Sequence, residues 1–126
     1  MRLERLDHLV LTVADVQATI GFYSRVLGMQ PVTFGDGRRA LAFGDSKINL
    51  HQVGHELDPK ARRPTRGSAD LCFVVGTPLG QVLAELISKG IRVEEGPVKR
   101  TGALGPVESV YLRDPDGNLI ELSTYD

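Results

Sequence analysis

The stretch Asp114-Pro-Asp-Gly-Asn-Leu-Ile-Glu-Leu, residues 114–122, joins a predicted turn to a predicted strand near the end of the chain. A Pro-Asp-Gly-Asn sequence favours a tight reversal, and the alternating side chains after it favour a β-strand. Glu121 lies in the middle of that strand, between Ile120 and Leu122. Because strand interiors are poor in glutamate, the position predicts a functional carboxylate that is held by rigid backbone.

Length and composition limit the class of protein. The 126 residues fit one domain, and a net charge of −1 gives no support to a nucleic-acid partner. The single cysteine, Cys72, excludes an intramolecular disulfide and a multi-cysteine zinc site. The first residues lack a signal core and no apolar run reaches membrane-spanning length, so we expect a cytoplasmic protein with no membrane partner.

The first half of the chain predicts a strand, a helix and three strands. Residues 6–13 alternate as a strand does, and a helix follows between an Asp15 cap and Gly28. Three short strands separated by glycine turns then end at Val53. Residues 54–67 are polar and rich in positive charge, which indicates a linker between two halves.

The second half predicts the same order of elements. Residues 69–75 read as a strand, and Thr77-Pro78 fits the start of a helix that ends at Gly90. Residues 91–98 predict a strand, and a glycine-rich loop is expected over 99–106. The last two strands are expected over residues 107–112 and in the opening stretch.

Aligning the halves pairs four residues that can bind metal. Asp70 follows His8 by 62 residues, and Glu121 follows His51 by 70 residues. We attribute the difference to a longer loop over 99–106 in the second half. His8 is therefore expected to be equivalent to Asp70, and His51 to Glu121.

Each of these four residues lies on a strand whose opposite face is apolar. If the apolar faces pack on helices, the four side chains turn toward a shared cavity and form a mixed nitrogen and oxygen site, which suits Zn, Mn, Fe(II), Ni or Co. The alternative for any one of them is an ordinary solvated or hydrogen-bonded side chain, and Asp70 in particular fits the edge of a strand.

The chain resembles the vicinal oxygen chelate superfamily, which includes glyoxalase I, bleomycin-resistance proteins and extradiol ring-cleaving dioxygenases. The resemblance is carried by Leu6-Asp7-His8-Leu9, by residues 22–29 (Phe-Tyr-Ser-Arg-Val-Leu-Gly-Met) and by the opening stretch. It implies an α+β fold of two βαβββ modules whose curved mixed sheets surround a cavity. The expected modules are residues 4–53 and 68–124 of a single domain over residues 1–126.

The resemblance also implies a divalent metal ion, a small-molecule substrate and a homodimer. His8 matches the first metal ligand of the family, and His51 occupies the second position, which is Glu or Gln in several members. Asp70 stands where His is common, and Glu121 matches the final Glu. Since extradiol dioxygenases use two His and one carboxylate, Asp70 counts against ring cleavage unless His51 substitutes.

Three functions follow from the resemblance. The leading hypothesis is a metal-dependent lyase or isomerase of the glyoxalase type, in which Glu121 is the catalytic base. The alternatives are an extradiol dioxygenase and a non-catalytic protein that binds a drug or metabolite, as bleomycin-resistance proteins do. The substrate is expected to be a small molecule that chelates the ion through vicinal oxygens.

Four further residues are candidates for substrate binding. Tyr111 alternates onto the side of its strand where a cavity ligand could reach it. Lys99, Arg100 and Arg113 could receive an anionic substrate, with residues 102–106 as a mobile lid. The alternative is that these charges belong to an exposed, variable loop.

Overall fold

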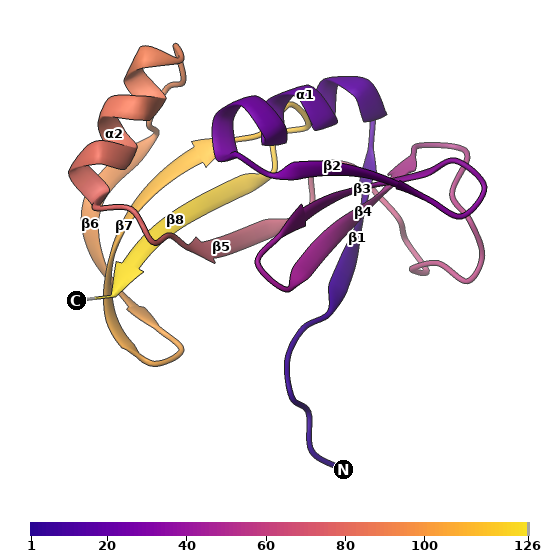
Figure 1. Ribbon diagram of the computed structural model, residues 1–126, viewed down its shortest axis with the longest axis horizontal. Helices are drawn as coiled ribbons and strands as arrows, with labels where there is room; N and C mark the ends of the chain where they lie inside the picture. Colours follow the sequence, from indigo (N-terminus) through magenta and orange to yellow (C-terminus); the bar gives the residue numbers. More distant parts are fainter. Residues whose placement is uncertain (126) are drawn as a thin grey trace. The chain divides into compact units, whose positions relative to one another are not determined.

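The computed structural model describes residues 1–125, which form eight strands and two helices (Figure 1). The chain divides into two compact units, Met1–Ser68 and a second that begins at Ala69. Each unit contains one strand, one helix and three further strands, as predicted for paired βαβββ modules of the α+β class. Neither helix within residues 1–125 is long and apolar enough to cross a membrane.

The first unit is a four-stranded mixed sheet with one helix on it. Its strand order is β1-β4-β3-β2; β1 runs parallel to β4 and the other pairs are antiparallel. The helix contacts the last three strands and lies on one face of the sheet (Figure 1). The elements are β1 (His8–Val13), α1 (Val16–Leu27), β2 (Gln30–Phe34), β3 (Arg38–Phe43) and β4 (Ser46–Gln52).

The second unit repeats this topology as β5-β8-β7-β6, with β5 parallel to β8. Its register differs from the first in one place, because the pairing of β6 with β7 shifts between Glu95 and Val98. The elements are β5 (Asp70–Val74), α2 (Leu79–Ser88), β6 (Glu95–Gly102), β7 (Gly105–Arg113) and β8 (Leu119–Tyr125).

The helix ends follow local sequence to different degrees. In α1, the Asp15 carboxylate accepts a hydrogen bond from the backbone N–H of Ala18 at 3.1 Å, and Gly28 ends the helix at φ 71°. In α2 the expected Thr77 cap is wrong. Pro78 occupies the cap position, because its ψ of 137° is extended, and the helix begins at Leu79.

The predicted loop over residues 99–106 is also wrong. β6 continues to Gly102 and pairs with β7 as far as Gly105, so most of this segment belongs to a hairpin. Backbone pairing along two adjacent strands holds the residues expected to form a mobile lid.

Apolar side chains fill the space between each sheet and its own helix. In both units the buried strand residues alternate with residues on the other side of the sheet. Burying each large aliphatic side chain stabilises the fold by roughly 1.5–3 kcal/mol, so these residues hold each sheet against its own helix. The buried set includes Leu11, Val13, Leu41, Ile48 and Leu50 in the first unit and Leu86, Val110, Leu112, Ile120 and Leu122 in the second.

The turn that precedes Glu121 is fixed by side-chain hydrogen bonds. Asp114 is buried, and its Oδ1 accepts hydrogen bonds from the backbone N–H groups of Asp116 and Asn118, each at 2.9 Å. Its Oδ2 accepts from the Asn118 side-chain amide at 2.8 Å, and Asn118 Oδ1 accepts from the backbone N–H of Ala69 at 2.9 Å. The turn thereby ties the start of β8 to the residue before β5 and places Glu121.

Candidate functional site

Each sheet has a face that its helix does not cover, which we call the open face. Alternation from Glu121 puts Ser123 on the open face of the second sheet, and the register adds Ser109 and Tyr111 from β7. These residues surround the carboxylate that the sequence singled out. The open face of this sheet is therefore polar where the opposite face is apolar.

Two buried hydroxyl groups hold the Glu121 carboxylate. Oε2 accepts a hydrogen bond from Ser109 Oγ at 2.7 Å and another from Ser123 Oγ at 3.2 Å. The two hydroxyl oxygens lie 2.6 Å apart, and both serines are fully buried. Oε2 is thereby held by two hydroxyl groups, and the Tyr111 phenol also hydrogen-bonds to this carboxylate.

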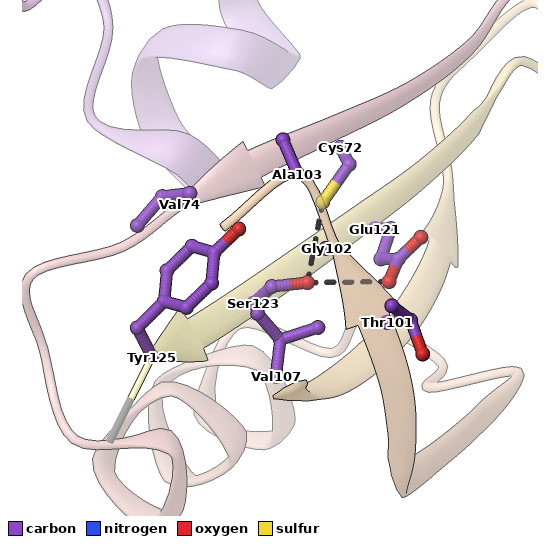
Figure 2. Close-up of a pocket in the computed structure, with 9 residues that line it drawn as sticks. All are labelled: Cys72, Val74, Thr101, Gly102, Ala103, Val107, Glu121, Ser123 and Tyr125. Carbon is purple, nitrogen blue, oxygen red and sulfur yellow. Dashed lines mark hydrogen bonds between the residues drawn. The ribbon is translucent and has the colours of Figure 1, made fainter. Parts of the chain in front are cut away.

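A cavity of about 350 Å³ lies against this carboxylate (Figure 2). A volume of this size suits a small organic molecule. Sequence reasoning missed Ser123 and Tyr125 as lining residues, although both follow Glu121 at the two-residue period of a strand. The lining residues are Cys72, Val74, Thr101, Gly102, Ala103, Val107, Glu121, Ser123 and Tyr125.

Cys72 extends the hydrogen-bonded group but is not an activated nucleophile. Its Sγ lies 3.2 Å from Ser123 Oγ, and Figure 2 shows this contact continuing to Glu121. Burial raises the pKa of the Cys72 thiol, and the charge of Glu121 adds to that effect. The thiol therefore stays protonated near neutral pH and can donate to Ser123.

Arg100 and Tyr111 are brought together beside Glu121. Arg100 Nε donates to the Tyr111 hydroxyl at 3.1 Å, and the guanidinium carbon lies 5.5 Å from the ring centroid. Tyr111 is directly opposite Glu121 in the register. Burial raises the pKa of the Tyr111 phenol, with a further contribution from the Glu121 charge, although the Arg100 hydrogen bond lowers it. Tyr111 is thus a neutral donor and acceptor at this site.

The other two predicted substrate-binding cations are placed elsewhere. Lys99 pairs with Glu108 in the register, and alternation puts both on the face opposite to Arg100. Arg113 forms two 3.0 Å hydrogen bonds with the Glu94 carboxylate, which already neutralises its charge. The structure therefore gathers Arg100 and Tyr111 at Glu121, but not Lys99 or Arg113.

His8, in the first unit, is exposed and oriented by its neighbour. Its Nδ1 lies 2.7 Å from Asp7 Oδ2. This hydrogen bond is the main cause of the lowered pKa of Asp7, with smaller contributions from Arg5 and Lys47. When Nδ1 donates to an ionised Asp7, the lone pair of Nε2 is left available. A carboxylate on the far nitrogen is the usual support of a histidine that binds metal.

Asp70 is exposed at the start of β5 and shares the open face with Glu121. It pairs with Leu119, whereas Glu121 pairs with Cys72. The two carboxylates are thus offset by two residues along adjacent parallel strands, about 7 Å along the strand direction.

The predicted equivalence of His51 and Glu121 is wrong. In the first sheet His8 pairs with Lys47, and His51 pairs with Thr12, four residues further along. The residue that pairs two beyond His8 is Asn49, as Glu121 pairs two beyond Asp70. Glu121 follows Asn49 by 72 residues, whereas the predicted equivalence of His51 and Glu121 requires an offset of 70.

His51 and Asn49 are both buried, with 7% and 5% of their surfaces exposed. Within residues 1–125 neither His51 Nε2 nor Asn49 Oδ1 has a hydrogen-bond partner. Burial lowers the pKa of His51, Arg38 and Lys60 lower it further, and Glu56 opposes them. His51 is therefore a neutral imidazole at pH 7.

Taken unit by unit, residues 1–125 contain no group of three His, Cys, Asp or Glu side chains arranged to hold a metal ion. His8 and His51 belong to the first unit, and Asp70 and Glu121 to the second. The individual donors nevertheless suit a divalent ion: His8 has Asp7 on its far nitrogen, Glu121 is fixed through one oxygen, and Asn49 has an unpaired amide oxygen.

Comparison with known proteins extends these observations. A family model described as the Glyoxalase/Bleomycin resistance protein/Dioxygenase superfamily matches residues 5–122. The virulence protein STM3117 of Salmonella typhimurium is 58% identical over 125 residues, covering 99% of this chain and 87% of that protein. Its crystal structure superposes with a TM-score of 0.99 over 100% of both chains. These matches confirm the predicted fold and the resemblance on which it rests.

Two further relatives have names that mention the family or a reaction. The glyoxalase domain-containing protein RDO1 of Mycosarcoma maydis is 59% identical over 120 residues, covering 95% of this chain and 68% of that protein. Lactoylglutathione lyase of Escherichia coli O157:H7 is 31% identical over 131 residues, covering 94% of this chain and 90% of that protein. The two relatives with nearly 60% identity bear names that specify no reaction.

Proposed function

Because the chain belongs to the Glyoxalase/Bleomycin resistance protein/Dioxygenase superfamily, we propose that it is a metal-dependent lyase or isomerase of the glyoxalase type. The observation that carries this proposal is the Glu121 carboxylate, which two buried serine hydroxyls hold at the wall of a cavity. The substrate is a small molecule with oxygens on adjacent carbons. A bound divalent ion would polarise those oxygens.

The protein side chains have separate roles in this proposal. His8 and Asn49 in the first unit, and Asp70 and Glu121 in the second, are the proposed donors to a divalent ion, and Glu121 would move a proton between the adjacent carbons that carry the substrate oxygens. Ser109 and Ser123 hold the Glu121 carboxylate through its Oε2 atom. Arg100 and Tyr111 bind a polar end of the substrate near Glu121.

The corrected register favours this reaction over ring cleavage. Extradiol dioxygenases use two histidines and one carboxylate. Asp70 stands at one of the histidine positions, and Asn49, rather than His51, is the register equivalent of Glu121. The proposed donors thus include one histidine, His8, and two carboxylates, Asp70 and Glu121. Such donors suit a metal ion that acts as a Lewis acid without changing its oxidation state.

Metal content tests the proposal. We expect protein purified without chelators to hold a divalent ion, and His8→Ala and Glu121→Gln to reduce metal affinity at least about tenfold. His55→Ala, in the exposed linker, and Glu108→Gln, on the other face of the second sheet, are matched controls. Metal content that is the same in all five proteins would contradict the proposed ligands.

Turnover separates the three functions. With metal bound, the glyoxalase hypothesis predicts isomerisation of a 2-oxoaldehyde adduct that Glu121→Gln abolishes. A yellow product from catechols after anaerobic loading with Fe(II) and admission of oxygen would instead identify a dioxygenase. Tight binding of a drug or metabolite without metal or turnover would identify a binding protein.

We also propose that the chain forms a homodimer. Leu3 and Leu6 lie in the segment before β1 with 90% and 64% of their surfaces exposed, which supports a partner for this segment. Light scattering during gel filtration should give twice the mass of one chain. A monomer at micromolar concentration would contradict this.

A further inference from the structure

Two positive side chains share one aromatic ring on the open face of the first sheet. Lys47 Nζ lies 3.6 Å from the centroid of the Phe34 ring, and the guanidinium carbon of Arg38 lies 4.8 Å from it. The three residues come from β4, β2 and β3. The ring attracts each cation, while the two like charges repel each other.

The carboxylates near these two cations are engaged with other partners. Within residues 1–125 the ion pairs involve other cations, and neither Arg38 nor Lys47 belongs to one. Asp7 lies near enough to Lys47 for that charge to lower its pKa, but its carboxylate contacts His8 and Arg5. Glu56 lies 3.8 Å from Lys60, which opposes its charge. The open face of the first sheet therefore keeps an excess of positive charge.

His51 adjoins this pair of cations and has a polar atom with no partner. Arg39 pairs with Leu50, so Arg38 and His51 are the next residues along the two antiparallel strands. His51 is 7% exposed, and no group within residues 1–125 hydrogen-bonds to its Nε2. A buried ring nitrogen without a partner costs free energy, which a ligand oxygen could recover by accepting from an Nε2–H group.

The side chains next to His51 on this face are small. Thr12, which pairs with His51, places a hydroxyl group on the same face. Ala40, in the next row of this face, is fully buried and carries only a methyl group. The base of the site is therefore small, while its edge is cationic.

We infer that Arg38, Lys47 and His51, arranged around Phe34, form a binding site for a small oxyanion such as a carboxylate or phosphate group. Arg38 contacts two oxygens of the anion, Lys47 supplies a second positive charge, and His51 donates from Nε2. The Phe34 ring keeps both cations on the same side of the sheet. The site lies within the first unit, on the same sheet face as His8 and Asn49, and none of its three polar residues is a proposed metal ligand.

The test is a titration of the whole protein with inorganic phosphate and, separately, with acetate at constant ionic strength and constant pH. NMR signals of the His51 ring and of the backbone amides of residues 38 and 47–51 report binding. We expect the chemical-shift changes to saturate in the wild-type protein. Arg38→Met and Lys47→Met should each weaken anion binding by about tenfold, because each removes one charge-assisted contact. Arg92→Met, on the second unit, should leave the affinity unchanged.

Either of two results would overturn the inference. Shifts that grow linearly with anion concentration, or equal affinities in wild type and Lys47→Met, would show that these residues bind no anion. Lys47→Met removes only the end of a flexible side chain, so it tests the site even if Arg38→Met fails to fold. Saturation by phosphate but not by acetate, or the reverse, identifies which oxyanion the site accepts.

Discussion

The two sheets have the same strand order but different chemistry on their open faces. The first sheet gathers Arg38 and Lys47 around Phe34 beside the buried His51. The second gathers Glu121 with the hydroxyl groups of Ser109 and Ser123. One face is set to receive negative charge, and the other carries it.

The faces toward the helices do not diverge in this way. Ile48 in the first sheet and Ile120 in the second are fully buried and apolar, and so are their cross-strand partners Leu41 and Leu112. Any polar group placed there would lose its contact with water without gaining a partner. A repeated fold can therefore change its chemistry only on the face that its helix leaves open.

The largest effect is expected where the second sheet departs from the first, at the register shift in β6. Gly96 has φ 112°, and a Cβ atom there would collide with the backbone of Ser109 and Val110. Gly96→Ala should therefore lower the free energy of unfolding by about 3 kcal/mol or more, measured by urea unfolding. Gly21, in α1, has no atoms near its Cβ position, so Gly21→Ala should stabilise the protein by about 1 kcal/mol. Equal effects would contradict the shifted register.

The next effect concerns the serines that only the second sheet places beside its carboxylate. Ser109→Ala removes the 2.7 Å hydrogen bond to Glu121 Oε2 and leaves the ligand less fixed. We expect metal affinity, measured by chelator competition, to fall by about tenfold or more, since partners of metal ligands contribute that much. Ser109→Thr should restore part of it, and Ser88→Ala on the surface of α2 is the control. Unchanged metal affinity in Ser109→Ala would show that this serine does not support metal binding by Glu121.

The smallest effect is a pH dependence that belongs to the first sheet. Burial lowers the pKa of His51 below its ordinary value of about 6.5, so on acidification the unfolded chain binds a proton before the folded protein does. Stability should therefore fall as the pH drops below about 6.5, by at most about 1.4 kcal/mol per pH unit, until the folded-state pKa is reached. Urea unfolding at several pH values should give a smaller slope for His51→Gln. The lowered pKa values of Asp7 and Glu94 act only at more acidic pH.

Alternation along the strands predicted more of the site than spacing between the halves did. The side of the strand on which Glu121 and Tyr111 lie follows from a two-residue period, which holds wherever a strand is regular. The equivalence of His51 and Glu121 depended on turn lengths, and a register shift of two residues keeps the face while changing the partner. The prediction therefore put His51 on the correct face but not at the position equivalent to Glu121.

The sequence by itself determined the order of the elements and the polar or apolar nature of each sheet face, because these depend on residues close together along the chain. Tertiary structure decided which charges meet: Arg113 pairs with Glu94 across 19 residues, and three strands bring Lys47 and Arg38 to one ring. It also decided that Glu121 is held by Ser109 and that Asn49 is its counterpart in the first sheet. Such contacts depend on strand register, and register is set by the pairing of strands and the lengths of turns rather than by local pattern.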